Sequence, residues 1–196
     1  MMKLGITGGI GSGKSYVARL LEDRGVPVYY TDDEAKRLMN TDKGIREALL
    51  RLIGRDAYLS GGELNKAAVA AYLFADSSHR ERVNAIVHPV VRRDFKRWAA
   101  EKSAPLVAME CAILFESGFD SLVDAVLAVC ASEAVRLERA MRRDGATEAQ
   151  IRGRMAAQWT DEERRARANY IIRNEGDADM GAEVDALLHR IAGMLP

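Results

Sequence analysis

The sequence predicts an α/β protein with a doubly wound, parallel sheet of five strands. Two observations support this fold class. Five short, apolar and often β-branched runs are spread along the 196 residues, and longer amphipathic stretches separate most of them. Strands that are apolar throughout are typical of parallel sheets covered on both faces, with helices as the crossover connections. The predicted strands cover residues 4–7, 26–30, 106–110, 125–130 and 170–173.

The first predicted strand leads into the segment GGIGSGKS, residues 8–15. The segment fits Gly-x-x-x-x-Gly-Lys-Ser, with Gly8, Gly13, Lys14 and Ser15 at the defined positions, and it lies between a strand and a helix. In such a loop successive backbone N–H groups point inward at phosphate oxygens, and the start of the helix adds the positive end of its dipole. Lys14 can reach the β- and γ-phosphates, and the Ser15 hydroxyl can bind Mg²⁺. A nucleoside triphosphate is therefore the predicted ligand, and a purely structural glycine turn is the alternative.

The second predicted strand is followed immediately by an acidic pair, Asp32 and Asp33. A carboxylate just past a strand end, beside the phosphate loop, can orient a phosphoryl acceptor and help it to lose its proton. We expect this role for Asp32. The alternative makes Thr31 or Asp32 the N-cap of the next helix, with the following acid favoured by the helix dipole.

A long helical insertion follows, over residues 31–103. Helices are predicted at residues 32–40, 43–53, 63–74 and 77–102, with a turn over residues 58–65 and Pro89 beginning or kinking a helix near the middle of the last segment. An insertion of this size indicates a subdomain that covers a substrate, or else a merely structural helical cap.

The third and fourth predicted strands precede an arginine-rich segment. Between Ser132 and Gly176 there are ten arginines and no lysine. Arg136, Arg139 and Arg143 share one face of a predicted helix. Arginine can bind two phosphate oxygens and stays charged when water is excluded, so Arg139 and Arg143 are predicted to close over the transferring phosphoryl group. Salt bridges to neighbouring acids on exposed helices are the alternative.

The composition excludes some classes of partner. Hydrophobic residues make up 48% and charged residues 30%, and Lys plus Arg equals Asp plus Glu at 29 each. No net charge attracts the chain to nucleic acid or to a membrane surface, and no obligate protein partner is evident. Cys111 and Cys130 lie in apolar stretches, as buried thiols of a reducing compartment do. With no N-terminal apolar run suited to a signal peptide, the predicted location is cytoplasmic.

Other nucleotide-binding classes fit less well. The guanine signature Asn-Lys-x-Asp of switch GTPases is missing, since the segment from Asn65 lacks the aspartate. An ATP-driven motor would carry an acidic pair at the end of a buried strand, where this chain has Glu110 alone. A small-molecule kinase is the class that remains favoured.

These motifs, taken with several further segments, resemble those of the dephospho-coenzyme A kinase family over nearly the whole length of the chain. The similar segments are TGGIGSGKS (7–15), YYTDDEAKRLM (29–39), VNAIVHPVVR (83–92), AILFESG (112–118), LERAMRRDG (137–145), RMAAQ (154–158) and ANYIIRNEG (168–176). The His-Pro segment at His88 and the lid segments are the discriminating ones. One departure is Tyr30, which stands where many relatives have the first acid of an Asp-x-Asp pair.

The resemblance implies transfer of the γ-phosphoryl group of ATP to the ribose 3′-hydroxyl of dephospho-CoA, the last step of coenzyme A synthesis. It implies a nucleotide-kinase-type P-loop fold, that of the nucleoside triphosphate hydrolases, with a parallel five-stranded sheet, a helical insertion and a lid. Residues 1–30 and 104–196 would form the core, with the lid at about 136–158, and residues 31–103 the CoA-side, acceptor-binding subdomain.

The motifs and the resemblance together assign the site residues. Lys14, Asp32, Arg139 and Arg143 are expected to be catalytic. ATP is expected at Gly8, Gly11, Ser12, Gly13, Lys14, Ser15, Tyr16 and Asn174, and the acceptor at His88, Arg92 and Glu116. Mg²⁺ is expected on Ser15, with Glu110 contributing through a bound water. His88 could instead pack between helices, and Glu116 could instead cap a short helix.

Two rival functions stay open. A kinase for a nucleoside or nucleoside monophosphate would share the core and the lid. A nucleotide-dependent switch that binds a protein partner would hydrolyse slowly without a small acceptor.

Overall fold

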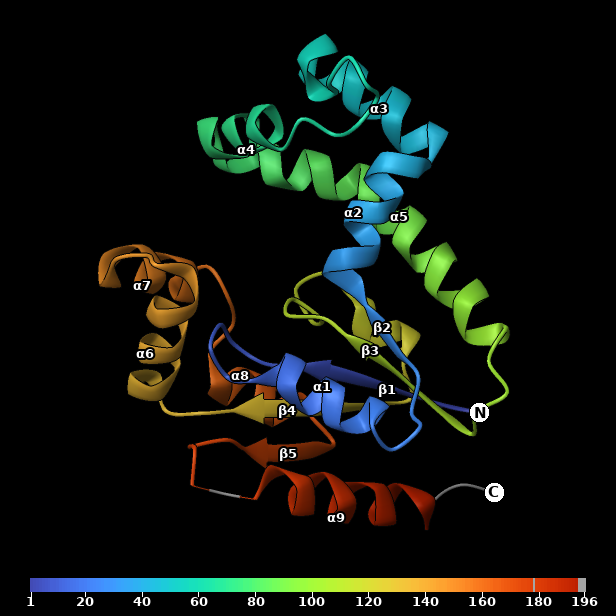
Figure 1. Ribbon diagram of the computed structural model, residues 1–196, viewed down its shortest axis with the longest axis vertical. Helices are drawn as coiled ribbons and strands as arrows, with labels where there is room; N and C mark the ends of the chain where they lie inside the picture. The colour runs from blue at the N-terminus through green and yellow to red at the C-terminus, as the bar shows by residue number, and fades with distance from the viewer. Residues whose placement is uncertain (178, 194–196) are drawn as a thin grey trace. The chain divides into compact units, whose positions relative to one another are not determined.

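The computed structural model, which describes residues 1–177 and 179–193, confirms the predicted α/β class. Its sheet has five parallel strands in the order β2-β3-β1-β4-β5 (Figure 1). The strands are β1 (Met2–Thr7), β2 (Val28–Tyr30), β3 (Leu106–Glu110), β4 (Ala125–Cys130) and β5 (Tyr170–Arg173). Because all five run the same way, the loops that follow them gather at one edge of the sheet, where open α/β sheets bind ligands.

Three strands have the predicted bounds, and the first and second each differ from prediction by two residues at the start. The second strand is shorter than predicted. It starts at Val28 and not at residue 26. Pro27 has no N–H to donate, so it contributes only its carbonyl, which accepts from Ala108 N at 2.8 Å. The first strand is longer than predicted, since Met2 pairs in register with Leu106.

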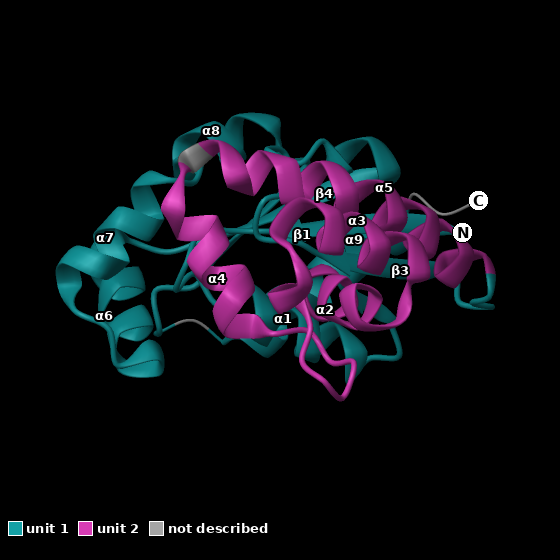
Figure 2. Cartoon of the chain, turned by 90° about the horizontal axis from the view of Figure 1, so that it is seen from above, with its two compact units in different colours: residues 1–30, 101–196 teal, residues 31–100 magenta. Residues whose placement is uncertain are grey.

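The chain forms two compact units, shown in different colours in Figure 2. The first contains residues 1–30 and 101–196, within which the sheet lies, and the second contains residues 31–100. The boundary falls at residue 100, where α5 ends, and not at 103. No helix of residues 1–177 and 179–193 is both long enough and apolar enough to cross a membrane.

Helices cover the sheet of the first unit on both faces. Leu106 and Ala108 of β3 belong to a core cluster with residues of α1 and α9, while the intervening Val107 is buried outside that cluster. This alternation explains why β3 and β4 are buried along their whole length. The helices of this unit are α1 (Lys14–Glu22), η2 (Phe119–Leu122), α6 (Glu133–Asp144), α7 (Glu148–Ala156), α8 (Asp161–Arg167) and α9 (Met180–Ala192).

The predicted lid segment, residues 136–158, is two helices joined by a turn. α6 ends at Asp144, and its C-cap Gly145 takes the left-handed conformation at φ 61°. A capping box formed by Thr147 and Gln150 then starts α7. The sequence carries both signals, a glycine followed closely by a Thr-x-x-Gln pattern.

The second unit is helical throughout, as predicted for the insertion. It contains α2 (Thr31–Thr41), α3 (Lys43–Ile53), η1 (Arg55–Ala57), α4 (Lys66–Ala75) and α5 (Ser77–Ala100). α5 packs against α2, α3 and α4 and supplies much of the core of this unit. α4 begins later than predicted because the side chain of Asn65 caps it, accepting from Ala68 N at 3.2 Å.

Two further expectations about the insertion are confirmed. The turn over residues 58–65 is closed by a hydrogen bond from Leu59 N to Glu63 O at 2.8 Å. Pro89 lies inside α5, which bends along its length in Figure 1. A proline lacks the N–H that would bond to the preceding turn and crowds its carbonyl, which accounts for a bend without breaking the helix.

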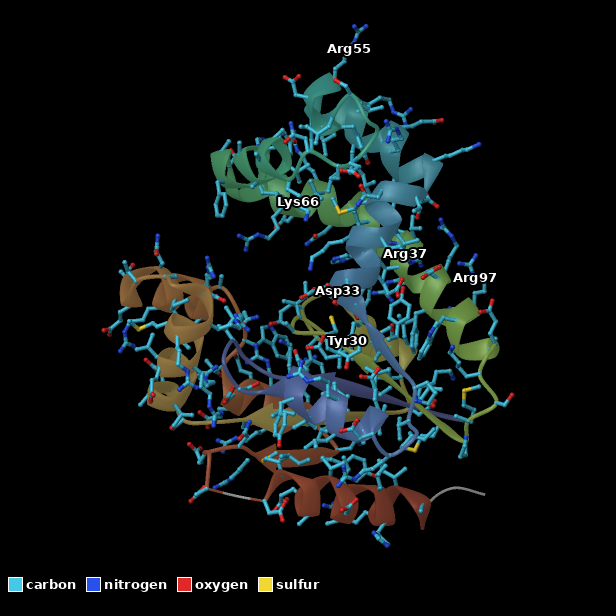
Figure 3. All side chains as sticks on the ribbon, in the orientation of Figure 1. Tyr30, Asp33, Arg37, Arg55, Lys66 and Arg97 are labelled. Carbon is cyan, nitrogen blue, oxygen red and sulfur yellow. The ribbon has the colours of Figure 1, made fainter. Side chains whose placement is uncertain are left out.

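One buried carboxylate ties α2 to α5 within the second unit. Asp94 accepts from Arg37 Nη2 at 2.6 Å and from Arg97 Nη2 at 2.5 Å, and only 6% of the residue is exposed. Figure 3 labels Arg37 on α2 and Arg97 on α5. Removing either charge partner would leave the buried carboxylate with less compensation, which is costly.

Candidate active site

The glycine loop between β1 and α1 presents backbone amides to an anion. Gly11 and Gly13 have φ of 79° and 91°, in the left-handed region that favours glycine. Gly13 is the N-cap of α1, and no side chain caps this end of the helix. The first N–H groups of α1 are therefore available to a ligand, and the helix dipole favours one that is negatively charged.

The loop is packed so tightly that its glycines are also required by space. A Cβ at Gly8 would lie 2.4 Å from the carbonyl oxygen of Val129 in β4. One at Gly13 would lie 2.2 Å from Nδ2 of Asn174, which follows β5. The loop is thus packed against β4 and against the residue that follows β5.

Glu110 organises the two reactive side chains of the motif. It ends β3, next to β1 in the sheet, and only 4% of it is exposed. Its Oε1 lies 3.3 Å from Lys14 Nζ and accepts a hydrogen bond from Ser15 Oγ at 3.2 Å. The Lys14 ammonium and the Ser15 hydroxyl, both from the start of α1, are therefore held by the same Glu110 carboxylate.

The donor set around Ser15 suits Mg²⁺. Magnesium takes few protein ligands, usually one or two oxygens, with substrate phosphates and water completing its shell. The Ser15 hydroxyl and the Glu110 carboxylate provide such oxygens beside the loop. No group of three or more His, Cys, Asp or Glu side chains within the described ranges could hold a metal by itself, so a metal here would depend on the nucleotide.

A cavity of about 370 Å³ opens over this loop. Arg139 and Arg143 of α6 line it, together with Gly9, Gly11, Gly13, Lys14, Ser15, Tyr16 and Arg19. The structure thus brings the two predicted arginines to the phosphate loop, as the spacing along one helix face suggested. The cavity has the size of a small-molecule pocket. Its lining includes five of the residues predicted to bind ATP: Gly11, Gly13, Lys14, Ser15 and Tyr16.

Asn174 and Arg139 join the end of β5 to the loop. Asn174 Nδ2 donates to the carbonyl oxygen of Ser12 at 3.0 Å, and its own carbonyl accepts from Arg139 Nη1 at 2.9 Å. Arg143 is more exposed and pairs with Asp144, Nε to Oδ1, at 2.7 Å. Both arginines therefore have protein partners while lining the cavity, so the salt-bridge alternative for Arg143 stays open.

Tyr30, at the end of β2, keeps its proton at neutral pH. Its hydroxyl donates to Glu22 Oε2 at 2.6 Å. Burial, followed by this hydrogen bond, raises the pKa of the Tyr30 phenol. The residue is a neutral hydrogen-bond donor and cannot replace the carboxylate that many relatives have there.

Glu116 contacts α8 and the segment that precedes it. Its Oε1 accepts from the backbone N–H of Trp159 at 3.1 Å and lies 3.5 Å from Arg164 Nη2. Gly118 is the N-cap of the short helix η2, and it makes no side-chain capping bond, so Glu116 does not cap this helix. The acceptor-binding role of Glu116 stays a prediction.

The remaining predicted residues lie in the second unit. Asp32 is exposed in the first turn of α2, two residues past the end of β2. His88 and Arg92 lie one turn apart on α5, and burial, with the charge of Arg92 as a smaller cause, lowers the pKa of the His88 imidazole. The Thr31 hydroxyl is buried without a hydrogen-bond partner, so it does not cap α2.

Sequence reasoning missed three residues that contact the phosphate loop. Gln158 Oε1 accepts from the Ile10 N–H at 3.0 Å. Arg136 Nη1 would lie 2.0 Å from a Cβ at Gly9, and Arg164 Nη1 would lie 3.4 Å from it. The sequence offered a partial signal for Arg136, on the same helix face as Arg139, but none for Arg164.

Comparison with known proteins gives a consistent family. The sequence profile of a family described as dephospho-CoA kinase matches residues 2–179. The chain is 46% identical over 188 residues to a dephospho-CoA kinase of Bacteroides fragilis (strain YCH46), covering 95% of this chain and 91% of that one.

Solved structures agree in fold. A Thermus thermophilus protein, TT1252, superposes with a TM-score of 0.84 at 34% identity, covering 100% of this chain and 98% of that one. A dephospho-CoA kinase from Campylobacter jejuni superposes with a TM-score of 0.70 at 19% identity, covering 96% of each chain, a likeness of fold alone.

Proposed function

The chain belongs to the dephospho-CoA kinase family, and from that premise we propose that it transfers the terminal phosphoryl group of ATP to the ribose 3′-hydroxyl of dephospho-CoA. The observation that carries the proposal is the phosphate loop with Lys14, Ser15 and Glu110 in contact, in a chain whose family match covers residues 2–179. A triphosphate held there has its outermost phosphorus free to meet an alcohol.

The donor side of the reaction is assigned to the loop and the start of α1. The amides from Gly11 to Ser15 hold the phosphates, and Lys14 leaves Glu110 to neutralise charge on the β- and γ-phosphates. Mg²⁺, held by Ser15 with Glu110 through a water, would neutralise further charge as the bond to the leaving phosphate breaks.

The acceptor side is assigned to Asp32 and the second unit. The Asp32 carboxylate accepts a hydrogen bond from the ribose 3′-hydroxyl and takes its proton as the oxygen bonds to phosphorus. The bond from phosphorus to the β-phosphate oxygen breaks in the same step, so ADP leaves. Because positioning supplies most of the catalysis in phosphoryl transfer, orienting the hydroxyl is the main contribution of Asp32.

Arg139 and Arg143 complete the proposed arrangement from α6. Both line the cavity over the loop, and both carry planar guanidinium groups suited to non-bridging phosphate oxygens. His88, Arg92 and Glu116 are proposed to contact the acceptor. We further propose that the reaction is cytoplasmic, supported by the buried thiols of Cys111 and Cys130, as expected in a reducing compartment. We also propose that it needs no obligate protein partner.

An acceptor screen tests the function. Purified protein with ATP and Mg²⁺ is incubated with dephospho-CoA, adenosine, AMP or CMP, and ADP formation is measured. ADP production that depends on dephospho-CoA is expected. Preference for a nucleoside or a nucleoside monophosphate would contradict the proposal, as would slow hydrolysis without any acceptor, the behaviour of a nucleotide-dependent switch.

A further inference from the structure

Arg136 of α6 packs along the outer part of the phosphate loop. A Cβ at Gly11 would lie 2.1 Å from the carbonyl oxygen of Arg136, and one at Gly9 would lie 2.0 Å from its Nη1. The main chain and the guanidinium of this one residue therefore span the loop from Gly11 to Gly9. Only 13% of its side chain is exposed.

The guanidinium of Arg136 has hydrogen-bonding capacity to spare. Its Nε is buried without a hydrogen-bond partner. Its ion pair with Asp161 Oδ1 is 3.5 Å long, whereas charge-assisted bonds to carboxylates are usually about 2.7–2.9 Å. The same Asp161 oxygen also faces Arg164 Nη1 at 3.3 Å. Asp161 Oδ1 is thus shared by the guanidinium groups of Arg136 and Arg164, and both contacts are longer than a usual charge-assisted hydrogen bond.

Arg164 adds a second positive charge behind Gly9. Its side chain is fully buried, and its Nε and Nη2 lack hydrogen-bond partners. Burial lowers the pKa of this guanidinium, while Glu116 and Asp161 oppose the shift. Keeping two like charges this close to one glycine is unfavourable unless further negative charge is nearby. The cluster is therefore suited to an anion on the loop.

A second cavity of about 360 Å³ is lined by Arg136 and by Gln158, two residues that contact the loop. The Gln158 carboxamide oxygen accepts from the Ile10 N–H at 3.0 Å. The backbone amide of Ile10, next to Gly9, is thus already hydrogen-bonded to an oxygen. Gly9 and Gly11 also line the first cavity, so the loop segment that Arg136 contacts borders the proposed ATP site.

We propose that Arg136 binds the terminal phosphoryl group of the nucleotide at the Gly9–Ile10 end of the loop, with Arg164 as a positioning residue behind it. This inference rests on the proposed function for the presence of a triphosphate. Arg136 would contact the γ-phosphate alone, in addition to Lys14 and the loop amides. Because ADP has no γ-phosphate, the contribution of Arg136 is specific to ATP over ADP.

Nucleotide binding without any acceptor tests this assignment. Calorimetry with ATP and with ADP, each with Mg²⁺, is compared for the wild type and Arg136→Met. We expect Arg136→Met to weaken ATP by about tenfold, the loss of one charge-assisted contact, and to change ADP binding by less than about twofold. Equal weakening of both nucleotides, or no change in either, would overturn the assignment.

Arg152→Met is the matched control. Arg152 of α7 lines the same cavity but is half exposed and pairs with Glu148 Oε1 at 2.8 Å. It should leave both affinities unchanged. If Arg152→Met instead shifted ATP selectively, the effect would be one of general charge and the role of Arg136 would be refuted.

Gly9→Ala provides a second test that retains the arginine. Gly9 has no positive φ, so alanine fits its backbone, but the new methyl would meet Arg136 Nη1 and push the guanidinium aside. We expect the same selective loss of ATP affinity, and no further loss in the double variant with Arg136→Met. Additive losses would show that the two residues act separately and would contradict the proposal.

Asp161→Asn tests whether Arg136 binds the nucleotide itself or acts only through its ion pair with Asp161. If Arg136 acted only through its ion pair with Asp161, this variant would reproduce Arg136→Met. We expect it to retain the preference for ATP over ADP, and circular dichroism checks that each variant is folded. Because none of these measurements needs dephospho-CoA, a failed acceptor screen and a failed role for Arg136 give different results.

Discussion

A single carboxylate, Glu110, holds the two side chains of the phosphate loop that carry the proposed chemistry. It pairs with Lys14 Nζ at 3.3 Å and accepts from Ser15 Oγ at 3.2 Å in a buried position. A nucleotide would compete with Glu110 for the lysine. The contact keeps Lys14 directed at the loop before ATP arrives, so less side-chain freedom is lost on binding.

Replacing Lys14 by alanine should remove most of the turnover. Without the ammonium, charge developing on the β- and γ-phosphates loses its main side-chain partner, and we expect kcat to fall about a hundredfold to a thousandfold. Steady-state kinetics measures the loss. Thermal unfolding should still be cooperative, and normal turnover by a folded variant would contradict the donor-site assignment.

Asp32→Asn should lower kcat about a hundredfold while changing ATP affinity little, because a general base is lost and the donor site is not. Asp33→Asn is the matched control, since Asp33 pairs with Lys36 Nζ at 2.8 Å on the exposed surface of α2. Rates and ATP affinities of both variants are compared. Equal rates for the two variants would remove Asp32 from the mechanism.

Arg143→Lys should reduce kcat by about tenfold, since lysine keeps the charge but loses the planar pair of donors. Arg142→Lys, at the neighbouring position of α6, is the control and should be near wild type. Arg143 also pairs with Asp144. An unchanged rate for Arg143→Lys would favour that salt bridge as its whole role.

At the scale of elements, the loop and helix α1 form one anion-binding unit whose glycines are required twice. Gly11 needs a left-handed backbone, at φ 79°, and it also has no room for a Cβ. The sequence motif predicts the first requirement. The second depends on α6, which lies more than a hundred positions further along the chain.

Gly11→Ala tests these two requirements together, and Gly25→Ala separates them. Gly25 has φ 81°, but nothing lies within 4 Å of a Cβ placed there. Both variants should lose about 1–2 kcal/mol of unfolding free energy through backbone strain. Only Gly11→Ala should also lose ATP binding, measured by calorimetry. Retained ATP affinity in that variant would mean that the loop does not depend on its contact with α6.

At the scale of the whole molecule, the burial of Cys130 in β4 makes the protein less stable at alkaline pH. Burial first, and the charge of Asp161 second, raise the pKa of the Cys130 thiol from 9.0 to about 11. Between these values the unfolded chain releases the proton and the folded chain keeps it. The unfolded state then binds fewer protons, so the free energy of unfolding falls as the pH rises.

Denaturant titrations at several pH values from 8 to 11 measure this dependence. The wild type should lose stability over the interval from about pH 9 to pH 11, and Cys130→Ala should lose less over the same interval. Subtracting the two curves removes contributions from other groups, among them Tyr30. Parallel curves would show that Cys130 does not supply the effect.

The sequence by itself determined the fold class, the nucleotide loop and the family. These features depend on residues that are close together in the sequence. The strands are apolar runs of strand length, and the glycines and helix start of segment 8–15 set the backbone conformation of the phosphate loop. The helical insertion and its turn followed from the same kind of local signal. Asp32 follows the last residue of β2 by two positions in the sequence, so its place beside that strand end follows from chain connectivity.

Only the tertiary structure decided which residues surround the loop. Ile10 and Gln158 are 148 positions apart in the chain and share a hydrogen bond. Arg136 of α6 and Arg164 of α8 meet at Gly9 and share Asp161 as a partner. Nothing in the spacing of these residues predicts the contact. It follows from the order of the strands in the sheet, which brings the loops after β1, β4 and β5 to one edge, and from the burial that forces their side chains to share a few partners.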